Sequence, residues 1–62
     1  MFIVNAIDTD GIEYPTEHYH FEEAFENFEV NIQGALNGQR IQLIYIDLEE
    51  SQTLLMDEIK GK

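Results

Sequence analysis

The residues of this chain that are best able to do chemistry are carboxylates, and one group of them lies in a predicted turn. Asp8-Thr9-Asp10-Gly11-Ile12-Glu13 places oxygen ligands at alternate positions, as a calcium-binding loop does. A complete loop also needs further ligands at fixed positions between two helices, and here the spacing fails and a strand is expected before the segment. Asp10-Gly11 is a common turn pair, because Gly tolerates positive φ and Asp can bond to its own backbone. We therefore predict an ordinary hairpin turn that exposes carboxylates.

Two histidines form the second group. His18 and His20 would point to the same side of a strand, with Glu17, Glu22 and Glu23 close in sequence. Zinc takes three or four ligands from Cys, His and carboxylate, and the chain contains no cysteine. A zinc site at His18 and His20 would therefore need carboxylate ligands from nearby acidic residues. Surface histidines beside a helix start are favoured, and we predict neither a metal nor another cofactor.

Groups that could carry out catalysis are few. Ser51 is the only serine, there is no thiol, and Lys60 and Lys62 lie near the end of the chain. Many carboxylates could pair as acid and base. However, a chain of 62 residues has little room for a pocket of the ~300 Å³ that ligand sites usually need. The sequence therefore predicts that the protein is not an enzyme.

Three glutamates follow helical spacing. Glu22, Glu26 and Glu29 share one face of a predicted helix and step about 5 Å along it. Successive phosphates of a DNA strand are also several ångströms apart, so this array could enter a groove that binds a phosphate backbone. Other acids lie in or near predicted turns and strand ends and could extend the array: Asp8, Asp10, Glu13, Asp47, Glu49, Glu50, Asp57 and Glu58.

The charge balance decides how this array is interpreted. Thirteen acids face three basic residues, for a formal net charge of −10, and residues 1–39 contain no Lys or Arg. This charge disfavours direct binding to nucleic acid or to anionic membranes. The array could simply solvate the exposed side of a helix. Because ordinary surfaces mix both signs, the shortage of cations favours a binding role.

The elements that position these residues follow from hydrophobic periodicity, and we expect one domain over residues 1–62. Strands are predicted over residues 1–8 and 12–20, and Pro15 places the second at a sheet edge. From Phe21 the period changes to that of a helix, which Asn37-Gly38 would end, with one apolar face: Phe21, Ala24, Phe25, Phe28, Ile32, Ala35 and Leu36. Residues 40–48 read as a strand, and 53–59 as a strand or a short helix. The predicted fold is α+β, ββαββ, with one helix packed on a small antiparallel sheet.

The predicted strands are apolar on both faces, whereas one helix covers only one. In residues 40–48, Ile41 and Leu43 point one way while Ile44 and Ile46 point the other. A homodimer would cover the second face; the alternative is a curled sheet whose termini fold over its back. Met1 leads directly into apolar residues without a signal-peptide pattern, and no apolar run is long enough to span a bilayer, so we expect a cytoplasmic protein.

In size, acidity, lack of cysteine and an acidic helix on a small sheet, the chain resembles phage-encoded host-takeover proteins that mimic DNA. These include inhibitors of the HU nucleoid protein, of uracil-DNA glycosylase, and of restriction and Cas nucleases. The resemblance implies a stoichiometric inhibitor that acts in the host cytoplasm by occupying the DNA-binding surface of a basic protein, with an HU-type protein as the first candidate. It transfers no functional residue. The alternative is a small dimeric adaptor that binds through an apolar patch.

Overall fold

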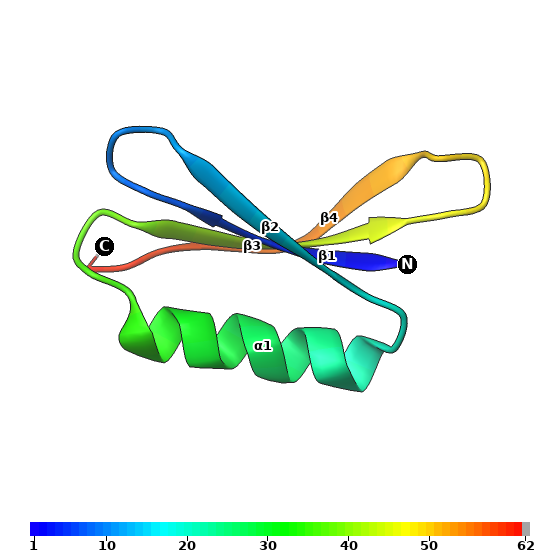
Figure 1. Ribbon diagram of the computed structural model, residues 1–62, viewed down its shortest axis with the longest axis horizontal. Coiled ribbons are helices and arrows are strands. Elements are labelled where there is room, and N and C mark those ends of the chain that lie inside the picture. The colour runs from blue at the N-terminus through cyan, green and yellow to red at the C-terminus, as the bar shows by residue number, and fades with distance from the viewer. Residues whose placement is uncertain (62) are drawn as a thin grey trace.

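A computed structural model describes residues 1–61, and within them the chain forms four strands and one helix. The elements are β1 (Phe2–Ile7), β2 (Glu13–His18), α1 (Phe21–Gly34), β3 (Arg40–Ile46) and β4 (Gln52–Ile59). The strands make one sheet in the order β2-β1-β3-β4, and every neighbouring pair is antiparallel. The helix covers one face of this sheet (Figure 1). The predicted ββαββ fold is confirmed.

The first hairpin joins β1 to β2 through the predicted Asp-Gly turn. The Asp8 N–H donates to Ile12 O over 2.8 Å, and the Gly11 N–H donates to Asp8 O over 2.9 Å. Gly11 has a φ of 88°, a conformation that favours glycine. Pro15 lies in β2 opposite Asn5, and β2 is at the edge of the sheet, as predicted from the missing proline N–H.

The helix is shorter than the sequence predicts. It begins at Phe21 as expected but ends at Gly34, and Ala35 is already extended, with φ −73° and ψ 148°. The placement of Ala35 and Leu36 on a helical face is therefore wrong, and Leu36 is 71% exposed. The predicted turn at Asn37-Gly38 does exist, because Gly38 has a φ of 90°, but it leads into β3 and does not end the helix.

The hydrophobic core lies between α1 and the two central strands. Ala24 and Phe28 of the helix are buried against Val4 of β1 and against Ile41 and Leu43 of β3. Val4 lies opposite Leu43 in the sheet, so the core residues form a continuous layer. Alternation along the strands directs these side chains to one face, where burial of apolar area stabilises the fold.

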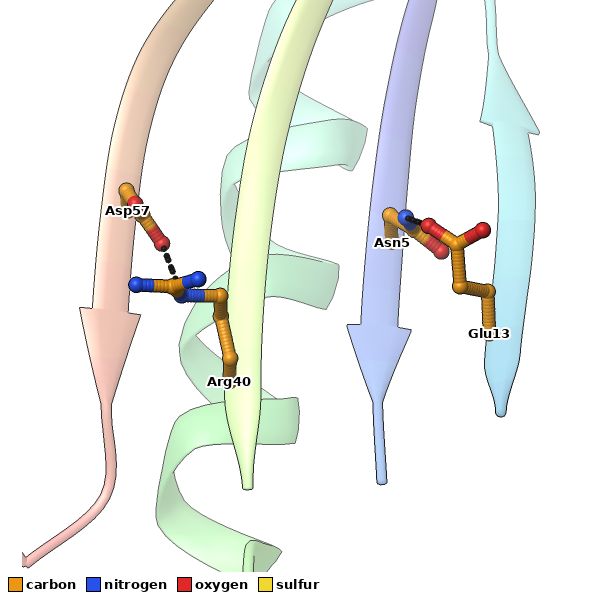
Figure 2. Close-up of polar contacts among 4 residues, drawn as sticks. All are labelled: Asn5, Glu13, Arg40 and Asp57. Atoms are coloured by element: carbon orange, nitrogen blue, oxygen red, sulfur yellow. Dashed lines mark hydrogen bonds and ion pairs between the residues drawn. The ribbon is translucent and has the colours of Figure 1, made fainter. Parts of the chain in front are cut away.

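The other sheet face, called the open face here, is turned away from α1. A row of apolar side chains crosses it, in which Ile3 lies opposite Ile44 and Ile44 opposite Leu54. Figure 2 shows two polar pairs on the same face, Asn5 with Glu13 and Arg40 with Asp57. By alternation the open face comprises Ile3, Asn5, Ile7, Glu13, Pro15, Glu17, Arg40, Gln42, Ile44, Ile46, Gln52, Leu54, Asp57 and Ile59.

The last element, β4, is a strand, which settles the choice that the sequence left open between strand and helix. β4 pairs with β3 over its whole length, with a register shift that leaves Leu55 without a cross-strand partner. Such a bulge bends an edge strand. Among the residues that the structure describes, no helix is long and apolar enough to cross a membrane.

Candidate partner-binding surface

The acidic residues of α1 lie on its outer side. Ala24 and Phe28 face the sheet, and helical spacing then turns Glu22, Glu26 and Glu29 toward solvent, where all three are exposed. Two of the helix acids lie in its first turn, where the positive end of the macrodipole favours negative charge. The structure thus brings the three predicted helix residues together in one line, which we call the helix array.

No cation in residues 1–61 neutralises the helix array. The Arg40 Nε lies 3.1 Å from Asp57 Oδ1, an ion pair between β3 and β4 on the open face (Figure 2). The Lys60 Nζ donates to the Ile32 carbonyl near the C-terminal end of α1 over 2.9 Å. Both described cationic side chains therefore act elsewhere, and the array presents uncompensated negative charge.

The acids of the first hairpin make structural hydrogen bonds. Asp8 Oδ1 accepts from the Gln39 side chain over 3.1 Å and from the Thr9 N–H over 2.8 Å, and these bonds lower the pKa of Asp8 below its ordinary value of 3.8. Asp10 Oδ1 accepts from the Ile12 N–H over 3.3 Å. Glu13 Oε1 accepts from Asn5 Nδ2 over 2.8 Å, while Asn5 Oδ1 is buried without a partner. These acids shape the hairpin.

The acids of the second hairpin divide into one structural and two free side chains. Asp47 Oδ1 accepts from the Glu49 N–H over 2.9 Å and from the Ser51 N–H over 3.0 Å. Glu49 and Glu50 are exposed, and Glu50 has a φ of 65°, the only positive φ of a residue other than glycine within the described part of the chain. The turn therefore holds its two glutamates in a fixed position.

The nine predicted partner-binding residues do not form one continuous array. Glu22, Glu26 and Glu29 lie on the helix, whereas the two hairpin turns lie at opposite ends of the molecule, on the side of the sheet away from α1 (Figure 1). Glu58 of β4 is the acid that does adjoin the helix array. It lines, together with Glu29, a hollow of about 140 Å³ between α1 and β4. Glu58 lies opposite Ile41, a core residue, so its side chain is on the sheet face that α1 covers. The sequence, which placed Glu58 only in or near a turn or strand end, did not reveal this.

The histidines are separated by the end of β2. His18 is the last residue of β2, and its Nε2 lies 3.1 Å from Thr16 Oγ1, whereas His20 directly precedes α1. Over residues 1–61 no three side chains of His, Cys, Asp or Glu gather to hold a metal ion.

Hollows on the surface are larger than the length of the chain suggested. One of about 680 Å³ is lined by Met1, Tyr19, Tyr45 and Leu48 among others, so the expectation that no hollow of ligand size would fit is wrong. The reason is that it forms at the ends of elements and is open to solvent, so it needs no enclosing core. Its lining combines aromatic, aliphatic and acidic side chains.

No protein-family model, characterised protein or solved structure matches this chain. Its function is therefore inferred from surface chemistry.

Proposed function

We propose that the protein is an acidic DNA mimic that inhibits a basic DNA-binding protein by occupying its DNA-binding surface. The observation that carries the proposal is the helix array, in which Glu22, Glu26 and Glu29 are exposed in one line and no cation of residues 1–61 pairs with them. On an ordinary protein surface acidic and basic side chains are interspersed. Solvation of the helix alone would not require a row of acids without bases.

The spacing of the array supports the proposal. A rise of ~1.5 Å per residue places Glu22 and Glu26 about 6 Å apart along the axis, and Glu26 and Glu29 about 4.5 Å. Lys and Arg side chains that bind successive phosphates could meet carboxylates at such intervals. Binding would then rest on attraction between carboxylates and the partner's Lys and Arg, which salt screens.

The partner that this chemistry fits is a strongly basic protein of the host cytoplasm. By resemblance to phage-encoded DNA mimics, an HU-type nucleoid protein is the first candidate. The chain's own charge of −10 opposes direct binding to nucleic acid and to anionic membrane surfaces.

A dimeric adaptor is the second candidate, and one observation favours it. Ile3, Ile44 and Leu54 form an apolar row on the open face, and Leu54 is 52% exposed. An adaptor would bind through apolar area, so its affinity would depend little on salt and on the helix array.

The two candidates respond differently to removal of the helix array. We expect the change of Glu22, Glu26 and Glu29 to Gln to weaken competition with a 20-base-pair duplex for a purified HU-type protein by at least about tenfold, which is about 0.5 kcal/mol per carboxylate. The readout is fluorescence anisotropy of the labelled duplex. The affinity of the unchanged protein should fall steeply between 50 and 200 mM salt, as is typical of phosphate-like contacts.

The matched control removes the same charge from the first hairpin, by changing Asp10 to Asn and Glu13 and Glu17 to Gln. This control should compete nearly as well as the unchanged protein. If the helix variant also competes at full strength, or if the unchanged protein does not displace the duplex, the helix array is not a DNA mimic for this partner.

A further inference from the structure

Exposed aromatic and aliphatic side chains gather at the end of the molecule where α1 begins and β3 turns into β4. Tyr19 is 81% exposed, Tyr45 38% and Leu48 104%, the last a fully solvated side chain. All three line the hollow of about 680 Å³, together with Met1 and Glu50. We call this surface, Met1, Tyr19, Tyr45, Leu48 and Glu50, the tip patch. Contiguous apolar surface of this kind marks interaction sites.

Tyr45 and Met1 of the tip patch are held in place by contacts with neighbouring residues. The Phe2 ring centroid lies 5.2 Å from that of Tyr45 and 5.6 Å from that of Phe21, the first residue of α1. The Ile46 N–H donates to Met1 O over 2.8 Å, and the Met1 amino group donates to Ile46 O over 3.0 Å. The Tyr45 ring and the Met1 backbone are therefore fixed, and this part of the patch loses little conformational entropy when a partner binds.

The turn from Asp47 to Ser51 adds negative charge to the patch at a conformational cost. Glu50 adopts a φ of 65°, which is strained for a residue with a side chain and would suit Gly or Asn better. The turn keeps a glutamate there, and its carboxylate lines the hollow beside the aromatic rings. Glu22, which opens the helix array, is one residue beyond Phe21, whose ring contacts Phe2.

We propose that the tip patch binds the single-strand-binding groove of a basic protein, as a second binding surface beside the helix array, which extends the proposed function to mimicry of single-stranded DNA. Such grooves combine Lys and Arg with aromatic side chains on which unpaired bases stack. A duplex hides the faces of its bases, whereas a single strand exposes planar rings beside negative charge. Exposed Tyr19 and Tyr45 beside Glu50 present that combination.

Charge argues against a second copy of this chain as the occupant of the tip patch. Two copies would bring their Asp47, Glu49 and Glu50 carboxylates together. Within residues 1–61, the positive group that the patch contains is the Met1 amino group, which already donates to Ile46 O. Like charges at close range oppose association, whereas a basic groove is complementary to them.

The test uses two purified probes and a variant of the tip patch. One probe is an OB-fold single-strand-DNA-binding protein carrying fluorescent oligothymidylate, and the other is an HU-type protein carrying a fluorescent duplex. The tip variant changes Tyr19 and Leu48 to Ser. The control changes Ile12 and Tyr14 to Ser; these are 50% and 57% exposed and belong to the first hairpin. All four side chains are largely solvated, and circular dichroism melting should confirm an unchanged fold.

We expect the unchanged protein to release oligothymidylate from the OB-fold probe. The tip variant should need at least tenfold more protein, and the control should match the unchanged protein. The competition of the tip variant for the HU-type probe should be unchanged. The inference is overturned if oligothymidylate is not released, if the tip variant releases it as well as the unchanged protein does, or if the tip variant is weakened equally on both probes.

The inference rests on the proposed function, and the two probes separate their failures. Release of the duplex without release of oligothymidylate overturns the single-strand assignment and leaves DNA mimicry standing. Release of neither overturns both.

Discussion

Asp8 is a carboxylate whose hydrogen bonds connect the first hairpin to the loop before β3. The Gln39 side chain, 31 residues away in the sequence, donates to it and is the main cause of its lowered pKa. We expect Gln39→Ala to raise the pKa of Asp8 toward 3.8, because the charged form loses its strongest donor. Carbon-13 NMR titration of the Asp8 carboxyl group measures this. Gln33→Ala, at an exposed helix position, should leave the titration unchanged; an identical pKa in both variants would contradict the assignment.

The same hydrogen bonds give the protein an acid-sensitive contribution to stability. The pKa of Asp8 is lower in the folded chain than its ordinary value of 3.8. The stabilisation that the charged Asp8 carboxylate contributes is therefore complete when the pH is above 3.8. It is lost as the pH falls through the lower folded value. Gln39→Ala should therefore reduce the loss of stability on acidification below about pH 4, a difference that urea unfolding at pH 6 and pH 3 would measure.

Glu50 offers a second prediction at the scale of one residue. We expect Glu50→Gly to stabilise the fold by about 1 kcal/mol, because glycine adopts a positive φ without strain. The control Glu50→Gln removes the same charge and keeps the strained side chain. Chemical denaturation measures both. Equal stabilities for the two variants would show that the φ of 65° is not a source of strain.

At the scale of elements, the sequence predicted those features that depend on neighbouring residues. The start of α1 at Phe21 follows from a change of period, and the edge position of β2 follows from the missing N–H of Pro15. The end of α1 at Gly34 did not follow, and one contact near it joins the helix to a residue distant in sequence, since Lys60 Nζ donates to Ile32 O. The separation of the hairpin acids from the helix array also depends on where the folded chain places its strand ends, which spacing along the sequence does not give.

The bond from Lys60 to α1 leads to a prediction for the end of the helix. No basic residue lies in the last turn of α1, so Lys60 supplies from β4's side the positive charge that a helix C-terminus favours. We expect Lys60→Met to destabilise the fold by about 1 kcal/mol and to speed amide exchange in the last helical turn. Lys60→Arg should retain most of the protection. Unchanged exchange in Lys60→Met would show that the helix ends at Gly34 for local reasons.

At the scale of the whole molecule, the open face and the helix array lie on opposite sides of the sheet. A second copy that packs on the open face would cover Ile3, Ile44 and Leu54 and would leave both helix arrays on the outside. The array would then be doubled about a two-fold axis. We therefore propose that the functional unit is a homodimer joined through the open face.

Salt separates this self-association from binding to a basic partner. Each copy carries a net charge of −10, so two copies repel each other and salt should strengthen the dimer by screening. Partner binding should weaken with salt, because salt screens the attraction between the carboxylates and the partner's cations. Sedimentation at micromolar concentration should give a mass that rises from 7.2 kDa toward twice that value as salt is added.

Ile44→Asp should hold the chain at 7.2 kDa at every salt concentration, whereas Leu36→Asp, at an exposed position after the helix, should behave as the unchanged protein does. A 7.2 kDa species for the unchanged chain at all salt concentrations would rule out the dimer and leave the helix array of a single copy as the binding unit.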